Sequence, residues 1–366
     1  MSASSTAAEA STASEALAAA AALKQAEALL ESRRLAHAVL ALNHAEFLGA
    51  APDQCSAGRW LAAMLHGDWS AAWRECDAIR ARGGSDPDRF WQGEDFRGKR
   101  VVLRCLHGFG DAVQFLSYAP LLCTMASKLI VEVAPAMLEI AQYFDGVDEV
   151  ITWGEQAPAI APEWDVQMEI NELPYVFRTR IDDLPVATNY LHLPASTLRE
   201  VTPQPNSPNG FRIGLVWACG EWNPGRSIPI DMLRPLTRIP GCEFWNLQGG
   251  PPRKQWSRLG SHTHLHEAYS SCDTILKLAG LIAQLDLVIT PDTLAAHLAG
   301  ALGTRAWVML QHASDWRWMH DREDSPWYPS VRLFRQPSPG DWPSLVRELQ
   351  SSLILLSRSR QLRLVA

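Results

Sequence analysis

The sequence predicts an α/β protein with two parallel-sheet domains, preceded by a short all-α segment. Two patterns along the 366 residues support this fold class. Leu, Ala and Trp recur at helical spacing from about residue 14 to 82, without the alternation of a strand. From Val101 onward, short β-branched runs alternate with amphipathic stretches, which is typical of a parallel sheet covered by helices.

The composition is that of an ordinary globular protein, with 47% hydrophobic and 20% charged residues. The net charge of -7 provides no basic field, so we expect no binding to nucleic acid. The seven cysteines never form a C-x-x-C pair, which indicates neither a disulfide framework nor a zinc site. The start of the chain lacks the basic region of a secretory signal, and no stretch reaches the ~18 apolar residues of a transmembrane segment. We therefore expect a cytoplasmic protein.

The front of the chain divides into an Ala/Ser-rich start over residues 1–13, predicted to be disordered, and a helical segment over 14–85. Small or apolar residues recur in this segment at an offset of 34, the period of tetratricopeptide (TPR) helix pairs, where Leu35, Ala38 and Leu42 match Trp69, Ala72 and Cys76. An ordinary helical hairpin explains the same pattern, because only two units match. The segment either recruits a protein partner or braces the rest of the chain.

A turn-rich break at Gly83 and Gly84 precedes the first α/β domain, assigned to residues 86–205. We expect its strands near 101–106, 129–134 and 148–153, and its helices near 111–126 and 136–144. A less regular, proline-containing region follows. Pro203, Pro205 and Pro208 then indicate a linker, because neither a helix nor a sheet tolerates such a run.

The second α/β domain is assigned to residues 206–340, and a last helix near 341–358, within 341–366, is expected to pack back across the body. The expected strands are 211–218, 242–248, 286–290 and 305–310, and the expected helices are 230–238, 274–285 and 292–302. Two Rossmann-like domains of this kind facing a cleft make the architecture called GT-B.

In open parallel sheets, ligands bind beyond the carboxyl ends of the strands, where helix N-termini point backbone N–H groups outward. The first strand of the first domain runs into a glycine-rich turn and a helix, in the order His107, Gly108, Gly110, Asp111 and Gln114. The glycines permit a tight turn and close backbone approach. The helix dipole favours an ionised Asp111, which can then accept a proton from a sugar hydroxyl. The alternative is that Asp111 only caps the helix.

A second candidate site opens the helix after the strand DLVIT. Asp292 and Thr293 can cap this helix, and its N–H groups and the Thr293 hydroxyl are suited to a phosphate. His297 lies one turn further on the same face as Thr293, within reach of a diphosphate oxygen. A satisfied structural histidine is the alternative reading.

Two other strand ends of this domain carry candidate donor-binding residues. Trp217 ends the first strand, and Arg226 in the following loop is a candidate clamp for leaving-group charge. Gln248 ends the next strand and can hydrogen-bond a ribose or a base. Each can equally be a solvated loop residue.

Two polar clusters are set aside. Asp86 and Asp88 have the carboxylate spacing of metal-dependent sugar transferases but lie ahead of the first strand. His262, His264 and His266 alternate without an evident carboxylate or cysteine partner, so a structural use is favoured over a metal site.

Several segments together resemble bacterial TPR proteins whose C-terminal part is similar to the heptosyltransferases of lipopolysaccharide assembly, glycosyltransferase family 9. These segments are HGFGDAVQFLSYAPLL, FRIGLVWACG with RSIPI, FWNLQ, LIAQLDLVITPDTLAAHLAGALG, DWRWMHDREDSPWYPSVRLFRQ and GDW. The resemblance covers about residues 58 to 350, and the block from Leu281 to Gly303 is its most specific part.

This resemblance implies an inverting transfer without bound metal or cofactor, with the nucleotide sugar held mainly by the C-terminal domain and the acceptor by the N-terminal one. The catalytic Asp of the family's G-D-x-x motif corresponds to Asp111, and its D-T-x-x-x-H phosphate motif to Asp292, Thr293 and His297. Arg226 corresponds loosely to a basic residue that is usually Lys.

The chain also departs from the family. Leu294 replaces the usual Gly after the D-T pair, and the helical front is additional, which puts the heptose donor and the lipid-sugar acceptor in doubt. The expected function is therefore transfer of a sugar from a nucleotide-diphosphate donor to a glycan or protein. The alternative is a non-catalytic nucleotide- or carbohydrate-binding module with a TPR interaction surface.

Overall fold

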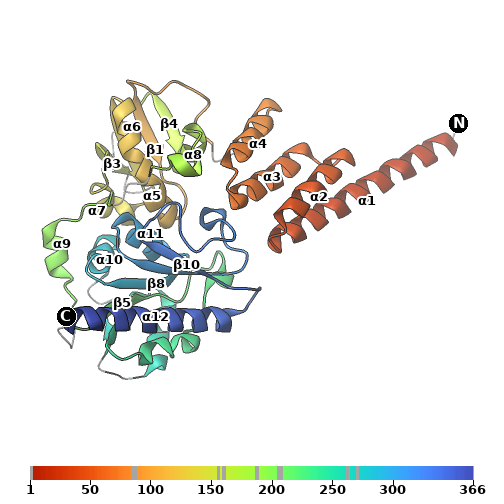
Figure 1. Ribbon diagram of the computed structural model, residues 1–366. Coiled ribbons are helices and arrows are strands. Elements are labelled where there is room, and N and C mark those ends of the chain that lie inside the picture. The colour runs from red at the N-terminus through yellow and green to blue at the C-terminus, as the bar shows by residue number, and fades with distance from the viewer. Residues whose placement is uncertain are drawn as a thin grey trace. The chain divides into compact units, whose positions relative to one another are not determined.

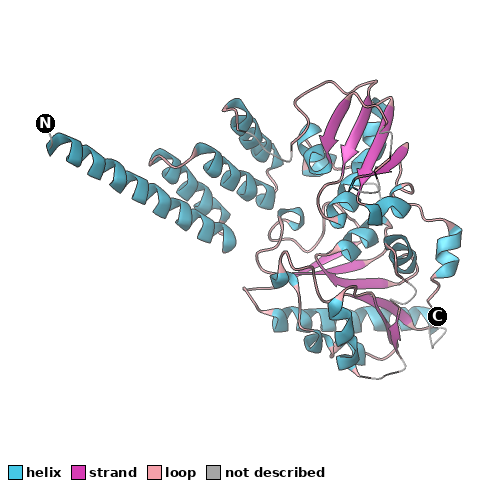
Figure 2. Cartoon of the chain, turned by 180° about the vertical axis from the view of Figure 1, so that it is seen from behind, coloured by secondary structure: helices cyan, strands magenta, loops and turns pink. Residues whose placement is uncertain are grey.

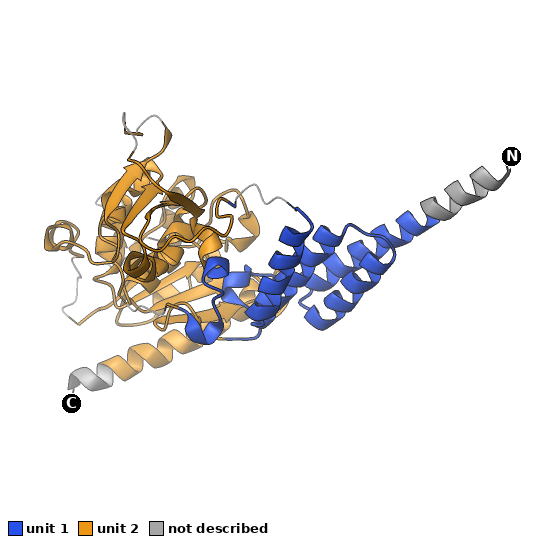
Figure 3. Ribbon diagram, turned by 90° about the horizontal axis from the view of Figure 1, so that it is seen from above, with its two compact units in different colours: residues 1–89, 174–184, 313–322 blue, residues 90–173, 185–312, 323–366 orange. Residues whose placement is uncertain are grey.

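The computed structural model describes residues 3–84, 89–154, 157–158, 162–185, 189–203, 209–260, 262, 264–268 and 272–365, with side chains from residue 14 to 360 of these. The chain forms two compact units (Figure 3). Unit 1 comprises Met1–Arg89, Pro174–Leu184 and Ala313–Arg322, and unit 2 comprises Phe90–Leu173, Pro185–His312 and Glu323–Ala366.

Unit 1 begins with the helices α1 (Ala3–Glu31), α2 (Leu35–Phe47), α3 (Pro52–His66) and α4 (Trp69–Ala81). The predicted helical segment is therefore confirmed. The helices α2 and α4 are both 13 residues long and begin at the two positions that the sequence match pairs. A TPR identity for them stays a prediction. The disordered start predicted over 1–13 stays one as well: α1 begins at Ala3, and no side chain before residue 14 is described.

Two later segments of the chain complete unit 1. The segments 174–184 and 313–322 contain the 3₁₀ turns η5 (Ile181–Asp183) and η11 (Trp316–Trp318). The Trp316 ring packs edge-on against Trp60 and Trp69, with centroid distances of 5.7 and 6.3 Å. Unit 1 thus gains part of its aromatic core from residues far along the sequence.

Polar contacts hold the segment 174–184 in unit 1. The Trp73 indole N–H donates to the Thr179 carbonyl at 2.8 Å. The Asp77 carboxylate accepts from the Tyr175 hydroxyl at 2.7 Å and pairs with Arg178 at 2.7 Å. The exposed ion pair alone contributes little, but the buried indole bond fixes the segment on α4.

The N-terminal lobe, defined as residues 90–173, contains the first sheet of unit 2. In the described residues this sheet is parallel with the order β3-β2-β1-β4, where the strands are β1 (Arg100–Arg104), β2 (Lys128–Val133), β3 (Glu149–Thr152) and β4 (Val166–Glu169). The helices are α5 (Phe109–Phe115), α6 (Ala119–Met125) and α7 (Leu138–Ala141), with 3₁₀ turns η1 (Leu116–Tyr118), η2 (Pro135–Met137) and η4 (Ile170–Glu172). Burial of the central strands makes this sheet the core of the lobe.

The C-terminal lobe, residues 209–312 and 323–365, contains the second sheet. In the described residues it is parallel with the order β10-β9-β8-β5-β6-β7, where the strands are β5 (Phe211–Leu215), β6 (Cys242–Asn246), β7 (Leu265–Glu267), β8 (Leu287–Pro291), β9 (Ala306–Leu310) and β10 (Val331–Arg335). The helices α10 (Ile275–Ile282) and α11 (Leu294–Ala301) cover one face, and α12 (Trp342–Val365) runs along the other (Figures 1 and 2). This is the doubly wound arrangement that alternation of strands and helices predicts.

The structure corrects several predicted elements. The helix predicted over 111–126 is divided into α5, η1 and α6, and Pro120 stands in the first turn of α6. The helix predicted over 230–238 is instead a pair of 3₁₀ turns, η7 (Ile230–Leu233) and η8 (Leu236–Arg238), with Pro235 between them. Proline explains both interruptions, since it lacks the N–H that a continuous helix needs.

Three strands were missing from the prediction. The strand β4 lies in the region predicted to be irregular, β7 has three residues, and β10 follows a stretch of mixed aromatic and charged residues. The strands around them, and the last helix, are as predicted within a few residues. No helix among the described residues combines the length and the apolar character needed to span a bilayer.

Candidate active site

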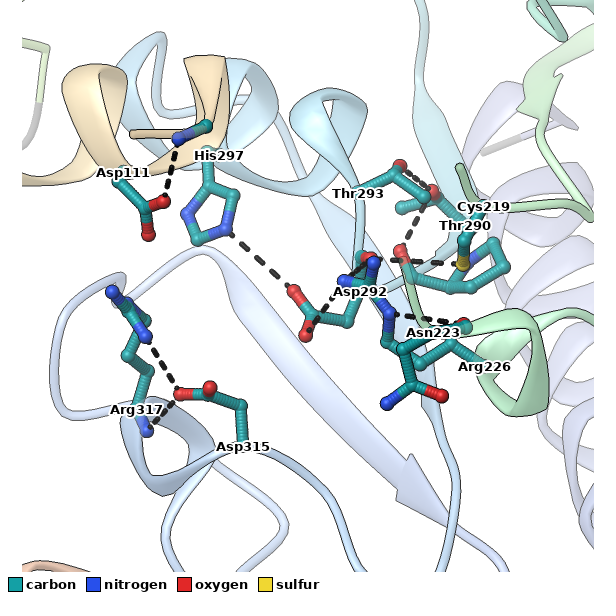
Figure 4. Close-up of polar contacts among 12 residues, drawn as sticks. Asp111, Cys219, Asn223, Arg226, Thr290, Asp292, Thr293, His297, Asp315 and Arg317 are labelled. Atoms are coloured by element: carbon teal, nitrogen blue, oxygen red, sulfur yellow. Dashed lines mark hydrogen bonds and ion pairs between the residues drawn. The ribbon is translucent and has the colours of Figure 1, made fainter. Parts of the chain in front are cut away.

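The two lobes of unit 2 meet where α5 packs against α11. Gly110 of α5 faces His297 of α11, and a Cβ atom built on Gly110 would lie 2.7 Å from Cδ2 of that ring. Figure 4 shows Asp111 and His297 as neighbours, followed by Asp292 and Arg226. The two groups of residues predicted from the sequence, one from each lobe, therefore lie side by side.

Asp111 is half-buried near the start of α5. Its Oδ2 atom accepts a hydrogen bond of 3.0 Å from the backbone N–H of Gly108, the residue that precedes the helix. The capping contact considered for Asp111 is thus present. This contact fixes the direction of the carboxylate, which lies at the junction with α11.

The start of α11 is arranged differently from the predicted cap. Thr293 occupies the N-cap position, but its hydroxyl makes no side-chain cap bond and instead shares a hydrogen bond of 2.8 Å with the Thr290 hydroxyl. The Asp292 carboxylate lies 3.4 Å from Arg226 and 3.7 Å from His297. A helix N-terminus suits an external anion, because its first-turn N–H groups have no partner within the helix.

Arg226 connects the loop after β5 to this helix start. Its Nη1 atom donates to the backbone carbonyl of Asp292 at 2.9 Å and lies 3.4 Å from the Asp292 Oδ2 atom. The guanidinium also stacks on the ring of Trp222 at 5.3 Å. The predicted phosphate clamp therefore stands beside the predicted phosphate helix, and its charge is partly balanced by one carboxylate.

His297 is almost fully buried and is held from both sides. Its Nδ1 atom lies 3.0 Å from the hydroxyl of Tyr328, and its Nε2 atom lies 3.7 Å from Oδ1 of Asp292. Tyr328 also packs against Gly300, where any Cβ atom would overlap the tyrosine ring. The sequence analysis missed Tyr328. This residue lies shortly before β10, and only the folded chain brings it to α11.

The side chains of Gln248 and Trp217 make contacts within the C-terminal lobe. The Gln248 amide oxygen accepts from the backbone N–H groups of Trp217 and Ala218 at 3.0 and 2.8 Å, and its NH₂ donates to two carbonyls. The Trp217 indole is buried in the core, where it stacks on Trp256. Both side chains therefore position the loop after β5.

Two predicted acceptor-side residues differ in exposure. His107 follows β1 with its side chain one-third exposed, at 32%. Gln114 lies one turn after Asp111 and is buried, and neither atom of its amide has a hydrogen-bond partner in the described part of the chain. Unpaired buried amides are rare in native proteins, so a bound polar group would satisfy this face of α5.

Glu169 is a second site residue that sequence reasoning missed. It ends β4, is 1% exposed, and its Oε1 atom lies 3.6 Å from Nε2 of His107. Burial raises the pKa of this carboxyl to about 8, and the neighbouring carboxylates of Glu172 and Asp111 act in the same direction. Nothing in the sequence indicated this residue, because β4 was not predicted and Glu169 was not recognised as the end of a strand.

The structure can be compared with the two polar clusters that were set aside as metal sites. Asp86 and Asp88 lie outside the described residues. His266 does have a carboxylate partner, Glu243 at 2.8 Å, and it stacks on Trp245, which is a structural use. The described side chains contain no group of three or more His, Cys, Asp or Glu residues that could hold a metal ion.

Comparison by sequence gives one informative relative. No family model matches the chain. Protein FlbA of Caulobacter vibrioides is 28% identical over 298 residues, which cover 74% of this chain and 50% of FlbA. The chain thus spans about half the length of this curated relative.

Comparison of structures identifies the fold. The glycosyl transferase family 9 protein from Veillonella parvula superposes with a TM-score of 0.54 at 11% identity, covering 74% of this chain and 99% of that one. E. coli ADP-heptose LPS heptosyltransferase II superposes with a TM-score of 0.50 at 14% identity, covering 71% and 99%. The predicted GT-B fold, with a helical segment in front of it, is confirmed, and it is the fold of these glycosyltransferases.

Proposed function

We propose that this protein is an inverting, metal-independent glycosyltransferase that moves a sugar from a nucleotide-diphosphate donor to a glycan or protein acceptor. The observation that carries the proposal is the contact between α5 and α11, which places Asp111 of one lobe beside His297 of the other. A base and a phosphate-binding helix start are the two parts that such a transfer needs in one place.

In the proposed reaction, the Asp111 carboxylate removes the proton from the acceptor hydroxyl as its oxygen attacks the anomeric carbon. The bond from that carbon to the diphosphate oxygen breaks, and the nucleoside diphosphate leaves with the electron pair. The hydrogen bond from Gly108 keeps the carboxylate directed during this step. A single displacement of this kind inverts the anomeric configuration.

The C-terminal lobe supplies the charge that the leaving diphosphate needs. Arg226 and the uncapped N-terminus of α11 lie together around Asp292, with His297 one turn further. Preorganised donors aimed at developing charge commonly contribute ~2.7 to 4 kcal/mol each to a transition state. These groups take the place of a metal ion in the proposal, which requires no cofactor.

The structural neighbours suggest which nucleotide sugar to test first as the donor. The name of the E. coli neighbour includes ADP-heptose, so ADP-heptose is the first nucleotide sugar to examine. Leu294 begins α11 at the position where glycosyltransferase family 9 usually has Gly. Other nucleotide sugars are therefore tested as donors as well. The nucleotide is therefore to be identified from a panel that varies both base and sugar.

The composition of unit 1 favours a role of the helical segment as a brace. Recruitment of a protein partner is the competing proposal. The segments 174–184 and 313–322, which follow β4 and β9 in the chain, are built into unit 1 with α1–α4. A free TPR array would need no such segments, since repeats normally contact only their neighbours. We propose that the protein acts in the cytoplasm, where nucleotide sugars are made available to such enzymes.

The function is tested by donor-dependent stabilisation followed by transfer. Each nucleotide sugar is added to the full-length protein, and a rise in melting temperature identifies the donor, since ligand at a hundredfold excess over Kd stabilises by ~2.7 kcal/mol. Transfer to candidate glycans and proteins is then followed by mass spectrometry. Binding without transfer or hydrolysis on any acceptor would favour a non-catalytic binding module, and no binding at all would contradict both.

A further inference from the structure

The N-terminal lobe holds a buried carboxyl group that the proposed mechanism does not use. Glu169 ends β4, pairs in register with Arg104 of β1, and is 1% exposed. Arg104 does not neutralise it, because the guanidinium pairs with Glu132 of β2 at 2.9 Å. A buried carboxyl without a cationic partner is rare enough to require a reason.

The hydrogen bonds of Glu169 are unequal. Its Oε2 atom accepts from the backbone N–H of Asn171 at 2.5 Å. Its Oε1 atom makes no hydrogen bond of standard geometry to a described residue. The backbone N–H of Leu106 also acts on the carboxyl, and Nε2 of the His107 ring lies 3.6 Å from Oε1. One oxygen is therefore well satisfied, and the other has His107 beside it.

The charges around Glu169 are mostly negative. Asp111 of α5 and Glu172 of η4 both act on it through space, and the buried thiol of Cys105, the residue after β1, lies near it. His107, from the loop after β1, lies beside Glu169 and can carry a positive charge or offer a lone pair. Burial and these carboxylates favour the protonated carboxyl, whose pKa is raised to about 8.

We propose that Glu169 is a positioning residue of the active site, which as a neutral carboxylic acid holds the His107 ring beside Asp111 on the acceptor side. The neutral acid is an O–H donor, and the Nε2 lone pair of a neutral His107 is its acceptor. The distance of 3.6 Å between Oε1 and Nε2 must shorten for this bond to form. His107, which is one-third exposed, then presents its other ring nitrogen to the acceptor.

Ionisation of Glu169 reverses this arrangement. A carboxylate can only accept hydrogen bonds, so the ring must turn or change its tautomer to offer N–H instead. A second negative charge also arises beside Asp111, at a site to which an anionic donor must come. Both effects lower transfer as the pH rises through about 8, which ties this inference to the proposed function.

The activity test is a pH profile of kcat/KM for three proteins. We expect the wild-type value to fall about tenfold between pH 7 and 9, as a single ionisation near 8 requires. Glu169→Gln stays neutral and keeps a donor, so its profile should stay flat over that range with near wild-type activity at pH 7. Glu149→Gln, on β3, removes a carboxylate that pairs with Lys128 and should keep the wild-type profile. An unchanged fall in Glu169→Gln would overturn the proposal.

A second measurement does not depend on transfer. The ring signals of His107, assigned with a His107→Gln variant, are followed by NMR between pH 6 and 10. They should change near pH 8 in the wild type and not in Glu169→Gln. Ring signals that titrate identically in both proteins would exclude the coupling, whether or not a donor had been found. Coupling without any transfer would instead leave Glu169 as inferred and contradict the proposed function.

Discussion

Gly110 and His297 approach each other so closely that the junction of the two lobes has no room for a methyl group at position 110. A Cβ atom there would lie 2.7 Å from Cδ2 and 3.2 Å from Nε2 of the His297 ring. The ring cannot easily retreat, because it is buried and held by Tyr328. Gly110 is thus required for space rather than for an unusual backbone angle.

Gly110→Ala should therefore separate α5 from α11 with little loss of fold. We expect kcat to fall by about a hundredfold, the size of effect that a displacement of about 1 Å produces. Gly220→Ala is the matched control, because nothing lies within 4 Å of a Cβ atom there. Steady-state kinetics with the identified donor measures both variants, and equal activity would show that the contact between the lobes is not essential.

Asp111→Asn removes the proposed base and keeps the shape of the side chain. Turnover should fall by at least about a hundredfold while donor affinity is retained, since a general base acts only in the chemical step. Turnover is measured with saturating donor, and affinity by calorimetry. Unchanged turnover would remove Asp111 from the mechanism.

Arg226→Met removes the guanidinium that lies beside the start of α11. We expect a loss of ~2.7 to 4 kcal/mol of transition-state stabilisation, which is about a hundred- to a thousandfold in kcat. Arg347→Met on α12 serves as the surface control, because Arg347 is exposed and donates to the Ser344 hydroxyl at 2.8 Å. Equal effects of the two variants would contradict a specific role for Arg226.

Tyr328→Phe removes the hydroxyl that holds Nδ1 of His297 at 3.0 Å. One neutral hydrogen bond contributes about 1 kcal/mol, so we expect roughly a fivefold fall in kcat/KM with a small fall in melting temperature. Gly300→Ala should have a larger effect on both, because its methyl group would displace the Tyr328 ring itself. A loss of stability without any change in kinetics would mean that Tyr328 supports only the fold.

The stability of the protein should depend on the protonation of Glu169. The folded-state pKa of about 8 lies above the ordinary value of 4.5, so between these values the folded protein binds the extra proton and stability falls as pH rises. Glu169→Gln, which never ionises, should be more stable than the wild type by a few kcal/mol at pH 8 and nearly equal at pH 4.5. Parallel denaturant curves across pH test this, and a constant difference would contradict it.

The sequence was sufficient for the parts of the fold that depend on local pattern. Buried apolar runs predicted the strands β1 and β8. The glycine-rich turn and the D-T-x-x-x-H pattern predicted Asp111, Thr293 and His297 as site residues, and the structure packs α5 against α11. Each of these signals lies within a few consecutive residues.

Contacts between distant residues could not be predicted in this way. β4 carries Gln167 and Glu169, which weaken its strand pattern, and Tyr328 reaches His297 only through the folded C-terminal lobe. Gln248 was recognised as a polar strand end, but its partners are backbone groups that only the ladder of β5 and β6 brings near. The role of each of these residues depends on partners that are distant in the sequence and close in the folded protein.

The placement of 174–184 and 313–322 within unit 1 limits how this protein can be shortened. A fragment beginning at residue 90 would keep both segments and lose the helices that surround Trp316 and Tyr175. Those aromatic rings would then be exposed to water, where they invite aggregation. The helical front is accordingly not an appendage that can be cut away at a single point, and deletions that respect the fold must remove three stretches of sequence together.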